Sequence, residues 1–210
     1  MRIILTLLAA LVAAPAFGQS VASLAGSYDG HQMEMGAELH LLADGRFEYG
    51  LAYGALDEAG QGTWSVQGDH VLLTSDPVTP PRFVFTGQKP APPGTLRFSL
   101  EAPQGVSLQY FDAVVLLAQG GSKGGQLKDD GLSLPLDPAD PPVSARMFFP
   151  MYELKSEATP IDPAKGYSLS FRFEPNDIGK ADFRGTSLAI DHGELVFDRF
   201  GRTIRFKRID

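Results

Sequence analysis

Residues 24–74 read LAGSYDGHQMEMGAELHLLADGRFEYGLAYGALDEAGQGTWSVQGDHVLLT, and this stretch decides the fold that we expect. Apolar and polar residues alternate in short runs, and turn residues separate the runs, above all Asp44-Gly45 and Gly68-Asp69. Alternation with a period of two places successive side chains on opposite faces of a β-strand. Glycine favours tight hairpins because it adopts positive φ readily. The stretch therefore predicts an antiparallel meander of short strands.

The remainder of the chain continues in the same style. Its 210 residues include 23 glycines and 16 prolines, which punctuate short runs, and helical periodicity is nearly absent. We predict an all-β fold in which the antiparallel meander forms a whole or partial barrel, followed by further antiparallel strands. A Pro/Gly-rich loop, residues 87–94, marks the expected boundary. It separates a first part, residues 19–93, from a second β region, residues 94–210, which is either a sandwich or a continuation of the same sheet.

The first residues have the layout of a secretory signal peptide. Arg2 is followed by an apolar run over residues 3–12 and then by small residues up to Gly18. We expect residues 1–18 to be removed, with cleavage after Gly18 or, as the alternative, after Ala16. No later apolar run has the length of a membrane-spanning helix. The predicted location is therefore the periplasm or the medium.

Cysteine content and charge exclude several classes of protein. The chain has no cysteine, which removes disulfides, thiolate metal sites, cysteine nucleophiles and a lipidated cysteine. Its 25 acidic and 18 basic residues give a formal net charge of −7. Nucleic-acid binding requires clustered basic residues that neutralise phosphates, so we expect no nucleic-acid partner.

Three short motifs carry a resemblance to a known family. Gly26-Ser27-Tyr28, the Asp-Gly-x-Phe hairpin at residues 44–47 and Gly62-Thr63-Trp64 resemble the small lipocalin-like barrels of bacterial envelopes. These include the amino-terminal domain of copper-response and envelope-stress lipoproteins. The resemblance covers residues 24–74 and implies a half-open or closed barrel, but it carries over no functional residue. The lipidated cysteine and the cysteine pair of those lipoproteins are absent here.

Apolar and aromatic residues of the first part could line a ligand cavity. A tyrosine inside a barrel needs a partner for its hydroxyl group, and a partly polar pocket would supply one. A packed core is the alternative, and the sequence does not separate a filled barrel from a hollow one. The candidate ligand-binding residues are Met33, Met35, Phe47, Tyr49, Tyr53 and Trp64.

A second candidate site is a metal site for a soft ion. His31, Met33 and Met35 are spaced to share one face of a strand, with His40 nearby. Thioether and imidazole ligands suit monovalent copper. The alternative is core packing of the two methionines beside an exposed histidine, since methionine commonly fills gaps in cores. We expect no organic cofactor.

Two patterns match catalytic motifs only formally. Residues 120–124 have the form G-x-S-x-G, but residues 125–131 do not favour the helix that a nucleophile elbow requires. Asp69-His70 and Asp191-His192 would form an acid/base pair if their turns met in space. Neighbouring residues of one strand point to opposite faces, however. We therefore do not expect an enzyme.

The sequence leaves more than one function open. The first hypothesis is a non-enzymatic exported β protein that binds a small apolar or amphiphilic ligand. The alternative is an envelope interaction or structural module without a ligand cavity, which uses an exposed edge or the basic carboxyl-terminal strand, residues 202–208. Periplasmic copper binding is a more distant alternative.

Overall fold

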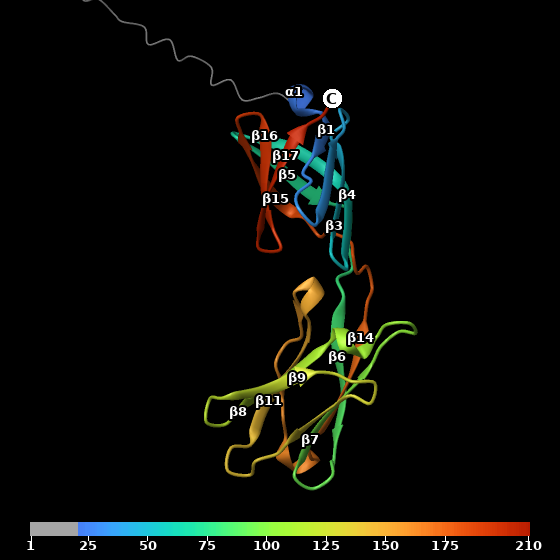
Figure 1. The fold of residues 1–210 in the computed structure, drawn as a ribbon, viewed down its shortest axis with the longest axis vertical. Coiled ribbons are helices and arrows are strands. Elements are labelled where there is room, and N and C mark those ends of the chain that lie inside the picture. The colour runs from blue at the N-terminus through green and yellow to red at the C-terminus, as the bar shows by residue number, and fades with distance from the viewer. Residues whose placement is uncertain (1–20) are drawn as a thin grey trace, which may run out of the picture.

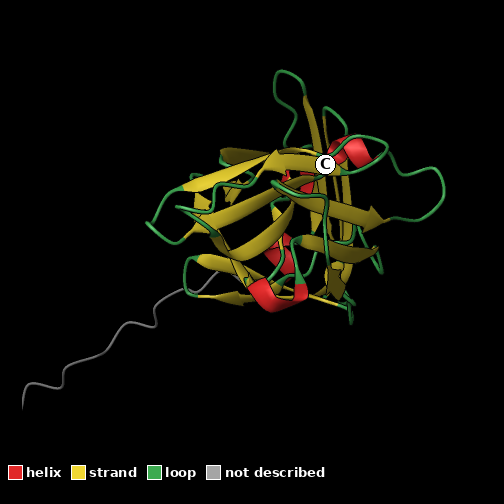
Figure 2. Cartoon of the chain, turned by 90° about the horizontal axis from the view of Figure 1, so that it is seen from below, coloured by secondary structure: helices red, strands yellow, loops and turns green. Residues whose placement is uncertain are grey.

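The computed structural model describes residues 21–210, so the expected signal peptide lies outside the described residues. The described chain forms two lobes stacked along the long axis of the molecule (Figure 1). One lobe is a barrel and the other is a sandwich of two sheets. The short helix α1 (Val21–Leu24) and the carboxyl terminus lie together at the end of the barrel away from the sandwich. Seen along the long axis, strands make up most of the described chain (Figure 2).

Eight strands close the barrel, and each pairs with its neighbours in antiparallel fashion. The predicted all-β fold with an antiparallel barrel and further strands is confirmed. In order around the barrel, the strands are β1 (Gly26–Asp29), β17 (Arg202–Arg208), β16 (Glu194–Arg199), β15 (Arg184–Asp191), β5 (His70–Ser75), β4 (Leu56–Gln67), β3 (Arg46–Tyr53) and β2 (Met35–Leu41).

The barrel takes strands from both ends of the chain. The chain enters the sandwich between β5 and β6 (Arg82–Lys89) and returns between β14 (Ser168–Glu174) and β15. The boundary expected between residues 93 and 94 instead falls inside the sandwich, between two strands of one sheet. A five-stranded meander leaves two unpaired edges, and β15, β16 and β17 cover both of them. The sandwich is thus inserted into the barrel sequence.

Two sheets form the sandwich, with order β10-β7-β14-β6 in the first and β12-β11-β8-β9 in the second, where β13 also pairs with β11. The pairing of β7 with β14 is parallel. The bounds of the remaining strands are β7 (Thr95–Glu101), β8 (Asp112–Leu117), β9 (Ser122–Gln126), β10 (Leu132–Pro135), β11 (Pro142–Phe149), β12 (Leu154–Lys155) and β13 (Thr159–Pro160). The 3-10 turns are η1 (Leu108–Tyr110), η2 (Pro150–Tyr152) and η3 (Pro163–Lys165).

Each lobe has its own hydrophobic core. Buried positions alternate with exposed or half-buried ones along β2 and β3, as expected for strands with one face toward a core. Phe111, Phe149 and Phe173 pack together in the sandwich, with ring centroids 4.6 to 5.6 Å apart. Met151 and Tyr152 of η2 pack against both cores and so join the lobes.

One segment differs from its predicted structure. Residues 31–35 were expected to form a strand with Met33 and Met35 on one face, and this prediction is wrong. Gln32 and Met35 exchange two backbone hydrogen bonds of 2.9 and 3.2 Å, which closes a tight turn, and Glu34 has a φ of 64°. Met33 is therefore at the tip of a turn and is 86% exposed, whereas Met35 begins β2 and is buried.

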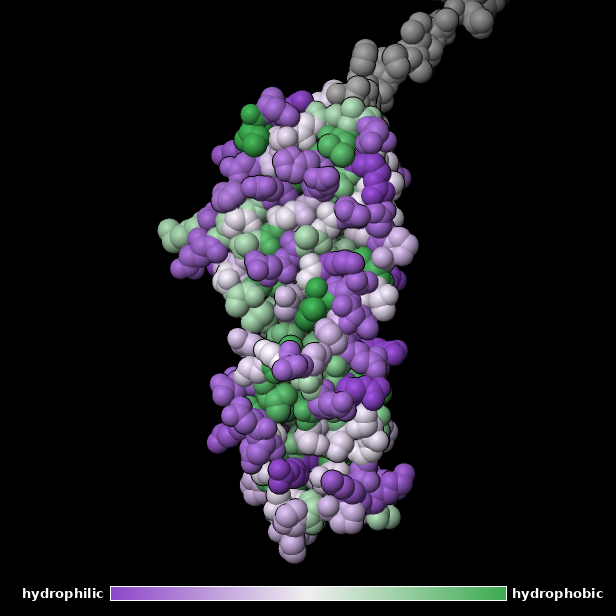
Figure 3. Space-filling view, turned by 90° about the vertical axis from the view of Figure 1, so that its right-hand side faces the viewer, coloured by the Kyte–Doolittle hydropathy of each residue, from purple (hydrophilic) through white to green (hydrophobic). Residues whose placement is uncertain are grey.

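Two connecting segments, residues 76–81 and 175–183, run together between the lobes. The backbone N–H of Asp177 donates to the Thr79 carbonyl at 3.0 Å, and the Asp177 carboxylate accepts from the Thr79 N–H at 2.9 Å. Apolar side chains gather around the junction and on the adjoining part of the sandwich, while hydrophilic ones cover most of the face in Figure 3. No helix within residues 21–210 is long and apolar enough to cross a membrane.

Candidate functional site

Aromatic side chains occupy the middle of the barrel. The Tyr49 ring lies 5.2 Å from that of Phe183 and 6.2 Å from that of Phe197, between centroids, and Phe47 lies 5.9 Å from Phe183. All four residues are at most 5% exposed. Protein cores are packed as densely as organic crystals, so rings at these spacings leave little free volume. The centre of the barrel is therefore packed by the protein's own side chains.

The residues predicted to bind a ligand are divided between this core and the surface. Tyr53 is half-buried at the end of β3, where its hydroxyl accepts a hydrogen bond of 2.7 Å from Arg202. Met33 is exposed in its turn. These two residues do not join the others around one cavity. The remaining four belong to the barrel core: Met35, Phe47, Tyr49 and Trp64.

The predicted metal ligands are also separated. His31 contacts the Asp29 carboxylate through Nδ1 at 2.5 Å, while the Nδ1 of His40 lies 3.1 Å from the Ser27 hydroxyl. Met35 is buried and Met33 is exposed. Within residues 21–210, no three or more His, Cys, Asp or Glu side chains are grouped so that they could hold a metal ion.

The two formal catalytic motifs acquire no catalytic geometry. Ser122 begins the exposed strand β9, which continues to Gln126 and is not followed by a helix. The turns that carry His70 and His192 do meet, since the Ile190 N–H donates to the Asp69 carbonyl at 2.8 Å. Each histidine nevertheless contacts the aspartate beside it in sequence, at 2.6 and 2.5 Å, and His192 is almost fully exposed. These contacts are those of solvated turn residues.

The basic carboxyl-terminal strand is neutralised within the barrel. β17 pairs with β16 on one side and with β1 on the other, so it is not an edge strand. Arg205 contacts both Asp191 and Glu194, at 2.9 and 3.2 Å, and Arg208 contacts Asp210 at 3.2 Å. A docking surface for an acidic partner therefore has few uncompensated charges on this strand.

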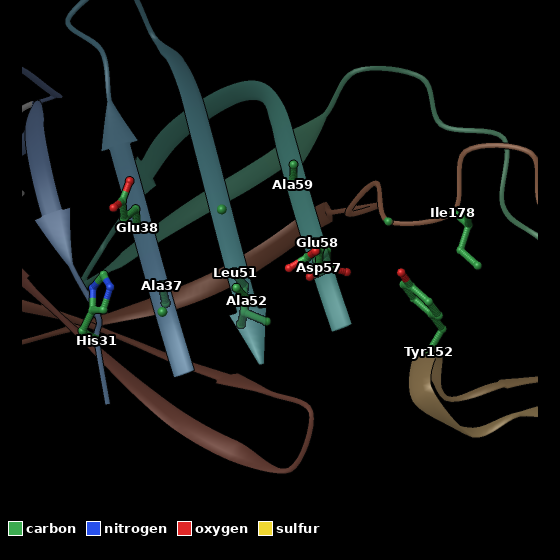
Figure 4. Close-up of a pocket in the computed structure, with 13 residues that line it drawn as sticks. His31, Ala37, Glu38, Leu51, Ala52, Asp57, Glu58, Ala59, Tyr152 and Ile178 are labelled. Carbon is green, nitrogen blue, oxygen red and sulfur yellow. The ribbon is translucent and has the colours of Figure 1, made fainter. Parts of the chain in front are cut away.

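A large hollow lies outside the barrel, where the barrel faces the sandwich. We call it the interdomain cleft, and its volume is about 660 Å³. It lies over the outer face of β2, β3 and β4, and part of the sandwich and the returning connector form its opposite wall (Figure 4). Its lining residues are His31, Gly36, Ala37, Glu38, Gly50, Leu51, Ala52, Asp57, Glu58, Ala59, Tyr152, Ile178 and Gly179.

Small residues form the floor of the interdomain cleft. Gly36 of β2 pairs with Ala52 of β3, and Gly50 of β3 pairs with Ala59 of β4. Ala52 and Ala59 are exposed, so their side chains are on the outer face of the barrel, away from the packed interior. Small side chains on three neighbouring strands leave the backbone surface open at Gly50, where a Cβ would meet no described atom within 4 Å, whereas the His31 ring lies over Gly36. The sequence of the outward positions thus creates the hollow.

The opposite wall is held against the barrel by backbone pairing. The Ala59 N–H donates to the Gly179 carbonyl, and the Ala181 N–H donates to the Ala59 carbonyl, both at 2.8 Å. Gly179 has a φ of 81°, and a Cβ at this position would lie 3.1 Å from the Asp57 carbonyl. A glycine is therefore suited to this close approach. The pairing fixes Ile178 and Gly179 beside the first half of β4.

The charged groups around the interdomain cleft are mainly acidic. Figure 4 shows the Tyr152 hydroxyl directed toward the part of β4 that carries Asp57 and Glu58. Burial raises the pKa of Tyr152, and the charges of Asp57 and Glu58 raise it further. Glu58 is 8% exposed and forms an ion pair with Arg199, whereas Asp57 is exposed. The cleft therefore combines an apolar floor, one phenol and carboxylates.

The fold and the site define a class of protein: an all-β chain in which a closed eight-stranded antiparallel barrel carries an inserted sandwich, with a cleft where the two lobes meet. Comparison with protein families, with curated proteins and with solved structures found no match for this chain. Its function must therefore be argued from the geometry of the site.

Several residues of the interdomain cleft were missed by the sequence analysis. Asp57, Tyr152 and Ile178 were not candidates, because nothing in the sequence shows that residues of β4, η2 and the connector come together. One signal was present for the floor. Small residues recur at outward positions of adjacent strands, as at Gly36 of β2 and Ala52 of β3, where solvated strands ordinarily carry polar side chains.

Proposed function

We propose that this chain is an exported, non-enzymatic binding protein that holds a small amphiphilic ligand in the interdomain cleft. The cleft itself is the observation that supports the proposal. Its volume of about 660 Å³ is in the range of small-molecule sites, about 300 to 1,000 Å³. Sites of this kind occur preferentially where two domains meet.

The composition of the cleft suits an amphiphile. The floor of Gly36, Gly50, Ala52 and Ala59 offers a smooth surface to an apolar group, and Ile178 adds an aliphatic wall. The carboxylates stand beside this floor, since Glu38 pairs with Gly50 and Asp57 pairs with Ala52. Few polar groups beside an apolar surface fix the orientation of a ligand while burial of its tail provides affinity.

The packed barrel centre favours a site outside it. An eight-stranded antiparallel barrel is compatible with a lipocalin-like barrel, and such barrels are wide enough to hold a small ligand. Here four aromatic rings occupy that space. The amino-terminal pattern of a signal peptide supports export, and therefore a ligand of the periplasm or the medium.

A fluorescent apolar probe tests the proposal. N-phenyl-1-naphthylamine should bind the wild-type protein saturably, with enhanced emission. Ala52→Trp places a large side chain on the floor of the cleft and should abolish this binding. Ala118→Trp is the matched control, because Ala118 is exposed just after β8, away from the cleft.

Either of two results would contradict the proposal. Equal binding by wild type and Ala52→Trp would place the probe elsewhere. No saturable binding by the wild type would favour the alternative, an interaction module without a ligand site.

A further inference from the structure

We infer that the ligand of the interdomain cleft is cationic, with an ammonium group that lies between Asp57 and Tyr152 and an apolar tail on the floor. The inference rests on the proposed function and names the chemical class of the ligand. It is drawn from the charges around the cleft and from the Tyr152 hydroxyl that is directed toward them (Figure 4).

Asp57 is a carboxylate of the cleft that has no cationic partner within residues 21–210. Glu58 is bound by Arg199, whereas Glu38 has at 3.9 Å only His40, which carries a charge only when it is protonated. The side chain of Asp57 forms no hydrogen bond and no ion pair with any of the described residues. Of the residues that line the cleft, none is Lys or Arg. An anionic ligand would therefore meet repulsion, and a cation would find an available partner.

Tyr152 supplies the second half of the cation site. It reaches the cleft from η2 of the sandwich, and its pKa responds to the charges of Asp57 and Glu58, so the phenol lies within electrostatic range of both carboxylates. Figure 4 shows the Tyr152 hydroxyl directed toward Asp57, and a phenol oxygen can accept a hydrogen bond from an ammonium group. A carboxylate from one lobe and a phenol oxygen from the other can thus hold one cation between them.

The far side of the cleft gives the apolar tail its direction. Gly36 and Gly50 continue the floor away from Asp57, toward His31. The imidazole of His31 contacts the Asp29 carboxylate at 2.5 Å, so a positive charge on it would be compensated locally. The His31 ring lies over Gly36, where a Cβ would be 3.2 Å from its Nε2, whereas a Cβ at Gly50 would meet no described atom within 4 Å. The tail of a ligand with its charge at Asp57 therefore lies over Ala52 and Gly50.

Three probes with the same eight-carbon tail test the inference: octylammonium, octyl sulfate and octanol. Each is titrated, below its micellar concentration, into the isotopically labelled protein, and amide NMR shifts report where and how tightly it binds. Octylammonium should shift the amides of Asp57, Ala59 and Tyr152 and should bind more tightly than the other two. Asp57→Asn should weaken octylammonium binding about fivefold, as expected for a partly exposed ion pair, and should leave octanol unchanged.

The control and the remaining outcomes separate this inference from the proposed function. Asp129→Asn removes one exposed carboxylate from a sandwich loop and should change none of the three affinities. If all three probes bound equally in the cleft, the cationic class would be wrong and the cleft would stand. If no probe shifted amides in the cleft, both would be wrong.

Discussion

Arg199 of β16 binds Glu58 of β4 across the end of the barrel that faces the sandwich. Its Nε donates to Oε2 at 3.0 Å, and its Nη2 donates to Oε1. The guanidinium group also lies over the rings of Phe183 and Phe200, 5.5 and 4.7 Å from their centroids. The two residues are 141 positions apart in the sequence. The pair therefore ties the amino-terminal meander to the carboxyl-terminal strands that close it.

Removing one partner of this pair should be costly. Arg199→Met leaves the buried Glu58 carboxylate without its cation, and we expect a loss of about 3 kcal/mol in the free energy of unfolding. The double variant Glu58→Met/Arg199→Met removes both charges and should recover much of that loss. Urea denaturation measures both. A wild-type stability for Arg199→Met would show that the pair does not stabilise the barrel.

Two buried tyrosines should respond differently to loss of the hydroxyl group. Tyr28 donates to the Leu24 carbonyl at 2.7 Å, so Tyr28→Phe should cost about 1 kcal/mol. The Tyr49 hydroxyl is buried and makes no hydrogen bond of normal geometry within residues 21–210, although Glu58 and Arg199 lie close enough to influence its pKa, which burial raises. Tyr49→Phe should therefore leave stability unchanged or raise it. Thermal unfolding of both variants checks the contrast, and an equal loss in the two would contradict it.

One glycine of β4 is required by close contact with a neighbouring strand. A Cβ at Gly62 would lie 2.0 Å from the Thr74 carbonyl oxygen and 2.7 Å from the Ser75 Cα. Because these are backbone atoms of β5, Gly62→Ala should cost about 2 kcal/mol. Gly50→Ala is the control, since a Cβ there meets no atom within 4 Å. Chemical denaturation should show a loss of stability in Gly62→Ala alone.

The connector between the lobes should weaken in acid. A hydrogen bond from Lys180 holds the pKa of Asp177 below its ordinary value of 3.8, and the Thr79 N–H lowers it further. Because the folded pKa is the lower one, this stabilisation is complete above about pH 3.8 and is lost as the pH falls through the folded value. Carbon NMR of the carboxyl group should give a pKa below 3.8.

A charge-removing variant isolates this contribution. Asp177→Asn keeps an acceptor for the Thr79 N–H but cannot titrate. The free energy of unfolding of Asp177→Asn should be lower than that of the wild type at neutral pH. This difference should become smaller as the pH falls. Asp129→Asn, at an exposed loop position, should follow the wild type throughout. A constant difference between Asp177→Asn and wild type at all pH values would contradict the assignment.

Local pattern was sufficient to predict the fold class. Alternation of apolar and polar residues predicted a meander of strands, and in β3 Phe47, Tyr49 and Leu51 face the core. The Asp44-Gly45 turn lies between β2 and β3 as expected. The insertion was not predictable in the same way. Closure of the barrel depends on pairing between β5 and β15. The alternating pattern of residues around Leu188 does not identify Val71 as the partner of Leu188.

The candidate site was less predictable than the fold, for a related reason. The interdomain cleft is made by outward-facing small residues and by Tyr152 from the other lobe. Because aromatic residues such as Tyr49 often line ligand cavities, the predicted ligand site was inside the barrel. In the structure these residues form the hydrophobic core. Met33 shows the limit of a short sequence pattern. Five alternating residues match a strand, but the backbone forms a turn between Gln32 and Met35.

A native mass spectrum of the protein, purified without denaturation from the cells that produce it, tests the central claim most directly. The wild type should retain a small-molecule adduct, and Ala52→Trp, prepared in the same way, should lack it. The same adduct on both proteins, in equal amounts, would place the ligand outside the interdomain cleft and contradict the account.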